Sequence, residues 1–149
     1  MNPADPDFEQ RVRQSFERQA AMRTLGAAVE SVEPGRVVLR MSHREELTQQ
    51  HGFIHAGMLS AALDSACGYA AFSLMPADAA VLTIEFKINL LAPARGPRFR
   101  FDGRVTKPGR TISVVDGRAS QVTASGEEQL IATMTATVMT VTGRDGVHH

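Results

Sequence analysis

The segment from Gly57 to Leu74 constrains the fold of this chain more than any other part of the sequence. It is apolar almost all the way round a helix, and many of its residues are small. The apolar members are Met58, Leu59, Ala61, Ala62, Leu63, Ala66, Cys67, Ala70, Ala71, Phe72 and Leu74. A helix with no polar face has to be buried, and small side chains let a sheet approach it closely. The segment therefore predicts a central helix covered by the rest of the chain.

The remainder of the sequence supplies strands for that cover. Apolar and polar residues alternate with a period of two in several segments, which is typical of strands with one buried face. These segments are 82–90, 99–105, 112–123 (with a bulge expected at Asp116-Gly117) and 130–138, and a hairpin is expected around Pro34-Gly35. The polar run from Ser42 to Ile54 reads as a loop. We predict an α+β fold in which an antiparallel sheet wraps around one long helix.

The ends of the chain differ from this central part. Asp5-Pro6 is typical of a helix start, apolar residues then recur every four positions, and Gly26 ends the pattern. We therefore expect an N-terminal amphipathic helical arm over residues 1–26, one domain over 27–142, and a disordered tail over 143–149. The length of 149 residues fits a single domain with its own core.

Composition excludes several functional classes. Lys plus Arg and Asp plus Glu both number 16, so the formal net charge is zero, which argues against a nucleic-acid binder. The single cysteine, Cys67, excludes an internal disulfide framework, and its place in the apolar segment predicts a core residue. No secretory signal is readable at the N-terminus, and Asp64 interrupts the one long apolar stretch. We expect a soluble cytoplasmic protein with no membrane partner.

Asp64 is the residue that most suggests chemistry. A carboxylate in the middle of an apolar helix is unfavourable unless it is hydrogen-bonded, paired or functional. Burial would raise its pKa, which suits a general base. The alternative is that Asp64 faces solvent or an interface beside Ser60, one turn earlier on the same helix face.

The chain enters the central helix through Gln49-Gln50-His51-Gly52-Phe53-Ile54-His55-Ala56-Gly57. Amides at a helix start have no partner within the helix and lie at its positive end, so they can hold an oxyanion. A plain junction between loop and helix is the alternative. His51 and His55 have the spacing of some metal ligands, but Gly52 disfavours helix there and no third ligand is nearby, so no metal site is predicted.

These residues carry a resemblance to a known family. The run from Gln50 to Gly57, followed by Ala62-Leu63-Asp64-Ser65-Ala66, resembles the HGG-x-aliphatic…D-x-A signature of the PaaI-like hotdog-fold thioesterases. The segments 82–89 and 93–96 are similar to the family's next strand and to the turn after it. The resemblance covers about residues 27–141. It implies a single hotdog domain that hydrolyses acyl-CoA thioesters as a homodimer or homotetramer, with no metal and no cofactor.

Two positions depart from the family pattern. Ala56 replaces the first glycine of HGG, which leaves the backbone amide in place, and Gln49 stands where the best-studied members have Asn. From the resemblance we expect the Ala56 amide to polarise the thioester carbonyl, with Gly57 allowing close approach. Asp64 would activate water or attack directly.

Further roles follow from the same expectation. Gln49 and Thr83 would orient the nucleophile, and His55 would hold the loop or contact the thioester. Arg95, Lys107 and Arg110 are candidates to bind the phosphates of CoA. Ordinary solvated charge in turns is the alternative for each of these three.

The spacing of the two central residues has a consequence of its own. Asp64 follows Ala56 by eight residues, which is about 12 Å along a helix, too far for both to act on one carbonyl. Two antiparallel helices related by a two-fold axis would bring Asp64 of one chain to the helix start of the other. We therefore expect a site shared between subunits. The alternative function is a non-catalytic acyl-CoA-binding or regulatory module on the same fold.

Overall fold

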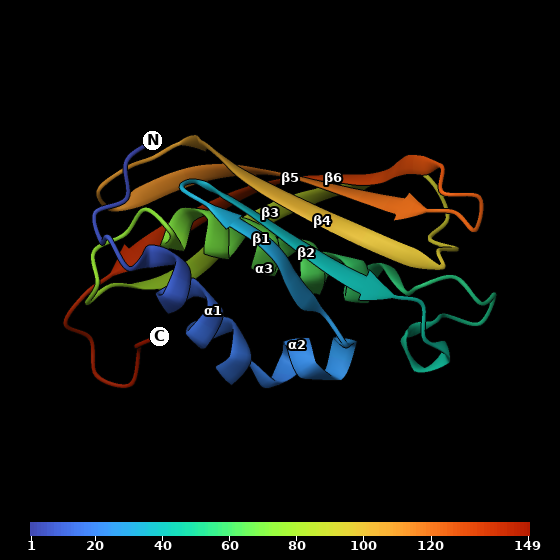
Figure 1. Ribbon diagram of the computed structural model, residues 1–149, viewed down its shortest axis with the longest axis horizontal. Coiled ribbons are helices and arrows are strands. Elements are labelled where there is room, and N and C mark those ends of the chain that lie inside the picture. The colour runs from blue at the N-terminus through green and yellow to red at the C-terminus, as the bar shows by residue number, and fades with distance from the viewer.

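The apolar segment forms the central helix α3 (Ala56–Phe72), and an antiparallel sheet of six strands curves over it (Figure 1). A computed structural model describes all residues, 1–149. The strands are β1 (Ala28–Glu33), β2 (Arg36–Ser42), β3 (Ala80–Leu90), β4 (Arg98–Lys107), β5 (Ile112–Val122) and β6 (Glu128–Val141), and their order in the sheet is β1-β2-β4-β5-β6-β3. The prediction of an α+β hotdog domain is confirmed.

The sheet approaches α3 closely where two glycines face each other. Gly103 on β4 pairs with Gly117 on β5. A Cβ on Gly103 would lie 2.4 Å from the carbonyl oxygen of Ala66, and one on Gly117 would lie 2.8 Å from the Sγ of Cys67. The predicted bulge at Asp116-Gly117 is wrong, because the register is regular there. Gly117 serves close helix packing instead.

The strand β3 carries a bulge that the sequence pattern does not reveal. Thr83 pairs with Val138 and Glu85 pairs with Thr137, so Ile84 is the extra residue. Residues directly opposite in a sheet share a face. Thr83 therefore faces α3 together with the buried Val138, whereas Glu85 faces outward and accepts a hydrogen bond from Thr137. The uninterrupted alternation expected over 82–90, with Thr83 and Glu85 on one face, is wrong at this point.

The N-terminal arm is two helices, α1 (Phe8–Arg18) and α2 (Ala20–Leu25), and not one. Gln19 between them is extended, with φ −83° and ψ 101°. The first helix begins at Phe8, with Asp7 before it and no side-chain hydrogen bond at that cap. The Asp5 carboxylate accepts a hydrogen bond from the Asp7 amide and forms an ion pair with Arg11. Buried residues of both helices join the main core: Val12, Phe16, Met22 and Leu25.

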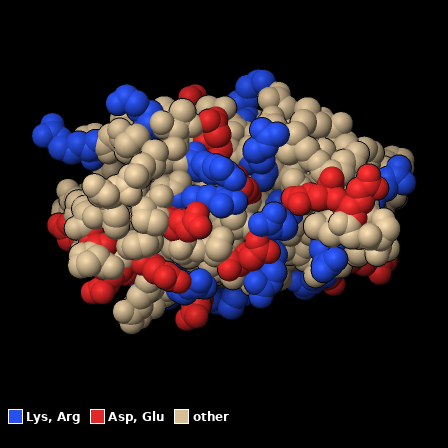
Figure 2. Space-filling view, turned by 45° about the horizontal axis from the view of Figure 1, so that its top comes forward, with Lys and Arg blue, Asp and Glu red and all other residues tan.

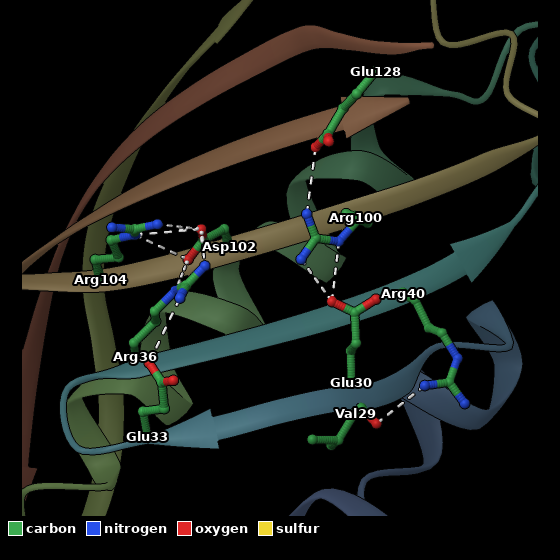
Figure 3. Close-up of polar contacts among 9 residues, drawn as sticks. All are labelled: Val29, Glu30, Glu33, Arg36, Arg40, Arg100, Asp102, Arg104 and Glu128. Atoms are coloured by element: carbon green, nitrogen blue, oxygen red, sulfur yellow. Dashed lines mark hydrogen bonds and ion pairs between the residues drawn. The ribbon is translucent and has the colours of Figure 1, made fainter. Parts of the chain in front are cut away.

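The outer face of the sheet is covered by intermixed charges (Figure 2). Arg36 donates two hydrogen bonds, of 3.1 and 3.0 Å, to the carboxylate of Asp102 on the neighbouring strand, and Arg100 pairs with Glu30 (Figure 3). Burial alone would raise the pKa of Asp102, but the hydrogen bonds from Arg36 and Arg104 hold that pKa below its ordinary value. This face is paired and polar, so the apolar core lies only on the side of α3.

The tail is exposed through Gly146, but its last residue contacts the domain. The His149 ring lies 4.6 Å from the ring of Phe72, and its Nδ1 is 2.7 Å from the hydroxyl of Ser15. These contacts involve an aromatic ring and a hydroxyl of the domain, and the disorder expected over 143–149 stays a prediction. None of the helices has the length and apolar character needed to cross a membrane.

Candidate active site

The start of α3 is capped by the side chain of His55. Its Nδ1 accepts a hydrogen bond of 2.8 Å from the amide of Gly57. A ring nitrogen that accepts carries no proton, so the proton of the neutral ring lies on Nε2. A Cβ on Gly57 would lie 3.0 Å from this same Nδ1, so glycine at this position leaves room for the cap. This cap is compatible with the expected role of His55 in holding the loop, and both expected roles of His55 stay predictions.

The amide of Ala56 differs from that of Gly57 because it has no hydrogen-bond partner within the chain. It is the first residue of α3, where backbone N–H groups have no acceptor in the helix and the helix dipole favours negative charge. Ala56 lines a cavity of about 530 Å³ together with Gln49, Phe53, His55, Leu59 and residues 90–94. A donor without a partner therefore faces a space that a ligand can enter.

Gln49 lies in this cavity but is partly engaged by its own loop. Its Oε1 accepts a hydrogen bond from the amide of His51. Its backbone also joins the loop, because its amide donates to the carbonyl of Phe53 over 2.9 Å. The Nε2 group has no partner in the structure and is the part of Gln49 that remains for a ligand or a water molecule.

Asp64 lies half-buried in the middle of α3 and is bound by one side chain. The hydroxyl of Thr83 donates to its Oδ1 over 2.8 Å, which the bulge in β3 makes possible. Burial raises the pKa of Asp64 above its ordinary value, and the hydrogen bond from Thr83 opposes part of that rise. Ser60 forms no hydrogen bond with Asp64, and its hydroxyl donates to the carbonyl of Ala56 instead.

Comparison with known proteins agrees with this fold. A family model described as the thioesterase superfamily matches residues 51–124. A Sulfurisphaera tokodaii protein named "Putative esterase" is 31% identical over 100 residues, which cover 67% of this chain and 74% of that protein. The chain belongs to the thioesterase superfamily. A solved structure from this superfamily, a thioesterase family protein of Silicibacter pomeroyi, is 57% identical with a TM-score of 0.89, and the alignment covers 91% of this chain and 99% of that one.

Two further matches are more partial or more distant. A Saccharolobus solfataricus protein, also named as a "Putative esterase", is 36% identical over 92 residues, which span 62% of this chain and 65% of that protein. The matched part is thus just under two thirds of that relative's length. The PaaI protein of the Escherichia coli phenylacetic acid degradation operon superposes with a TM-score of 0.82 at 20% identity, over 94% of this chain and 97% of that one, and so shares the fold.

Within this superfamily chain, the expected site residues fall into two groups. Gln49, His55 and Ala56 line the cavity at the helix start, whereas Asp64 and Thr83 line a second cavity, of about 240 Å³. Ala56 of the first group and Asp64 of the second are eight residues apart on α3, about 12 Å along its axis. One chain therefore presents two separate halves of the expected machinery.

The three basic candidates are also divided. The guanidinium of Arg95 stacks over the ring of Phe53, 4.8 Å from its centroid, beside the helix start. Arg110 instead lines a cavity with Met75 and Pro76, beyond the other end of α3, and Lys107 ends the strand that leads there. Arg95 is therefore close to a half-site within its own chain, and the other two are not.

Sequence analysis missed the residues that hold the turn at 93–96. Buried Gln121 accepts hydrogen bonds of 2.8 and 2.9 Å from the amides of Arg95 and Gly96, and its Nε2 donates to the carbonyl of Pro93. The sequence contained one signal for this role, because Gln121 is a polar residue at an inward-facing position of the strand predicted over 112–123. Phe53, which supports Arg95, lies in the loop before the helix, and the sequence alone assigned it no role.

Proposed function

We propose that this protein is an acyl-CoA thioesterase that works as a homodimer, or as a dimer of dimers, with each site shared between two subunits. The proposal depends on the presence of two groups in one thioesterase-superfamily chain. These are the helix-start amide of Ala56, which has no hydrogen-bond partner, and the half-buried carboxylate of Asp64. The amide is a donor for an oxyanion, and the carboxylate is a base. Together they provide what hydrolysis of a thioester requires.

The proposed reaction assigns one task to each group. The thioester carbonyl oxygen receives the N–H of Ala56, which stabilises the negative charge that develops there. Ionised Asp64 accepts a proton from water while the water oxygen bonds to the carbonyl carbon. The C–S bond then breaks, the electron pair leaves with sulfur, and the proton passes to the thiolate of CoA. Thr83 and the Nε2 group of Gln49 orient the carboxylate and the water.

Sharing between subunits follows from distance and from the open edge of the sheet. A base must lie within one water of the carbonyl on which it acts, and about 12 Å within one helix is too far. The strand β3 ends the sheet, so one of its sides has no strand partner. Its apolar side chains Leu82, Ile84, Phe86 and Leu90, with Leu91 beyond it, are 40–55% exposed. An open, apolar edge of this kind favours association with a second copy.

Basic side chains would hold the CoA phosphates. Arg95 is the best placed, because stacking on Phe53 orients its guanidinium beside the helix start. Lys107 and Arg110 lie beyond the C-terminal end of α3 and would reach a bound CoA only from its nucleotide end.

The decisive experiment mixes two inactive variants. Asp64→Ala removes the base, and Ala56→Pro removes the amide donor. The structure favours correct folding of Ala56→Pro, because proline is well tolerated at the first helical position and His55 before it has the extended ψ of 137° that proline requires. In a shared site, a mixed dimer has one site with both lesions and one intact site. About half the dimers are mixed after random assembly, so roughly a quarter of wild-type activity should return.

Two outcomes would contradict the proposal. A mixture no more active than its parents, with wild-type-like oligomers and thermal transitions, would show that each chain holds a whole site. Binding of acyl-CoAs without release of free thiol, across short, medium, long and aromatic acyl groups, would instead support the non-catalytic module.

A further inference from the structure

The cavity beside Asp64 ends at a wall made partly by the N-terminal arm. Besides Asp64 and Thr83, its lining includes Ser65, Gly68, Tyr69 and Gln19. Its volume is about 240 Å³. Cavities of about 150 Å³ hold a benzene ring, and sites that enclose a drug-sized ligand start near 300 Å³. The space beside the carboxylate therefore fits part of a ligand, about one ring or a chain of similar size.

A second cavity lies on the other side of the same wall. It has a volume of about 180 Å³ and extends from Gln19 and Tyr69 to Ser15 and Arg18. Gln19, Tyr69 and His149 line both cavities. These three side chains are therefore the partition between the space beside Asp64 and the space under α1.

Gln19 is held in the partition by hydrogen bonds at both ends of its amide. Its Oε1 accepts from the hydroxyl of Ser65 over 3.0 Å, and its Nε2 donates to the hydroxyl of Tyr69 over 3.3 Å. The extended backbone at Gln19, which separates α1 from α2, is what turns the side chain toward α3. Tyr69 is part of the core and packs on Phe16 and Phe72, so a substitution of Gln19 damages the core less than one of Tyr69.

We propose that Gln19 determines acyl-chain length in this protein by closing the far end of the acyl pocket. The inference rests on the proposed thioesterase function, in which the carbonyl lies at Asp64. The acyl group then extends into the cavity beside Asp64, while the CoA part of the bound substrate extends toward the surface. An acyl group longer than this cavity meets the Gln19 amide, whereas a shorter one does not. Without the Gln19 side chain the two cavities join, and longer acyl groups fit.

The test compares kcat/KM for hexanoyl-CoA and dodecanoyl-CoA. Wild-type protein should favour hexanoyl-CoA. Gln19→Ala should raise the ratio of dodecanoyl to hexanoyl activity by at least about tenfold, because a few methylenes admitted to a pocket change kcat/KM by this much or more. Gln19→Ser, which keeps a polar group at the break between helices, should shift the ratio in the same direction. Gln14→Ala, an exposed glutamine on the same arm, is the matched control and should leave the ratio unchanged.

The outcomes separate this inference from the proposed function. If wild-type protein hydrolyses no acyl-CoA, the proposed function fails and the inference with it. If wild-type protein is active but prefers dodecanoyl-CoA, or if both Gln19 variants keep the wild-type ratio, the function stands and the inference is overturned. A shift produced by His149→Ala and not by the Gln19 variants would also overturn it, because the wall would then belong to His149.

Discussion

The surroundings of Asp64 disfavour the ionised form of its carboxyl group. It lies half-buried on an apolar helix, and a single hydroxyl, that of Thr83, hydrogen-bonds to its carboxylate. Burial therefore raises the pKa of Asp64. A group whose pKa is higher in the folded state than in the unfolded state favours folding when protonated and loses that contribution as the pH rises through the folded value. The charge at Asp64 is thus unfavourable for stability at neutral pH, as is common for residues kept for function.

Asp64→Asn should separate activity from stability. We expect kcat to fall by at least about a hundredfold, the scale of a lost general base. At pH 7 the melting temperature should equal or exceed that of wild-type protein, because the substitution removes a disfavoured charge, and the difference should shrink as the pH falls toward about 4. Thermal denaturation at several pH values and a free-thiol assay measure both effects. Asp78→Asn, at an exposed position, is the control and should change neither activity nor melting temperature. An Asp64→Asn protein with full activity would show that Asp64 is not part of the mechanism.

Thr83→Val should move the pH profile in a defined direction. The hydrogen bond from Thr83 lowers the pKa of Asp64, so its loss raises that pKa further. The acidic limb of kcat/KM, which reports ionisation of the base in the free enzyme, should therefore shift to higher pH. Thr137→Val, on the outer face, is the matched control and should leave the limb in place. A limb that does not move in Thr83→Val would mean that another group titrates there.

At the scale of elements, the contact between α3 and the sheet depends on the absence of two side chains. Gly103 and Gly117 face each other on β4 and β5 beneath the helix. At Gly103 the obstacle to a Cβ is the backbone of Ala66, which cannot rotate away. At Gly117 the nearest atoms belong to the side chains of Cys67 and Leu63, which have some freedom. The two positions therefore differ in tolerance although their contacts have similar lengths.

Gly103→Ala should lower the free energy of unfolding by at least about 1–3 kcal/mol, the usual penalty for overpacking a core. Gly117→Ala should lower it less, because Leu63 and Cys67 can adjust. Gly68→Ala on α3, where a Cβ would have no neighbour within 4 Å, should be neutral or stabilising. Denaturation by urea at one fixed protein concentration ranks the three. A Gly103→Ala protein as stable as Gly68→Ala would show that the helix does not lie so close to β4.

The sequence predicted the elements whose patterns are local, and missed the features that depend on contacts between elements. The central helix and the four alternating strands follow from periodicity, and the confirmed burial of Cys67 follows from its place in the helix. The face of Thr83 depends on an extra residue at Ile84, which appears only in the register with β6. The break at Gln19 is accompanied by hydrogen bonds to residues of α3, and no turn signal marks it in the sequence.

The candidate site shows the same division. Gln49, His55, Ala56, Asp64 and Thr83 were found from residue type, spacing and family resemblance, and the structure places them beside two cavities. Their separation into two halves was also predictable, because the rise of a helix per residue is constant. The placement of Arg95 and Arg110 near different ends of α3 was not predictable, because charged residues in turns have no sequence pattern that shows which end of a helix they approach.

At the scale of the whole molecule, the two edges of the sheet have different surroundings. The first helix contacts β1, whereas β3 has no neighbour on its outer side and exposes apolar side chains. Proteins usually protect such an edge with charge, a bulge or a covering element. Here a bulge is present at Ile84, and Glu85 and Lys87 are charged, but apolar side chains are exposed along the same strand, which favours pairing over protection.

Phe86→Lys should therefore separate the subunits. Phe86 is 44% exposed on β3, and a charge there is unfavourable in an apolar interface. We expect the mass measured by analytical ultracentrifugation to fall to that of the monomer. Activity should be lost with it, because in the proposed mechanism each chain holds only half a site. Ile112→Lys, at a position 42% exposed on an interior strand, is the control and should keep the wild-type mass. A monomeric Phe86→Lys protein with full activity would contradict the shared site.

The free amide at Ala56 also bears on how such a protein tolerates mutation. A catalytic group that belongs to the backbone is present whichever side chain the codon specifies, and only proline removes it. Genetic drift can therefore exchange glycine and alanine at this position without selection detecting the change. Position 64 cannot vary in this way, because the proposed base is the side chain of Asp64 itself. Within one short helix, the two halves of the proposed chemistry would thus evolve under unequal constraint, and variability at Ala56 among related genes would say nothing about loss of activity.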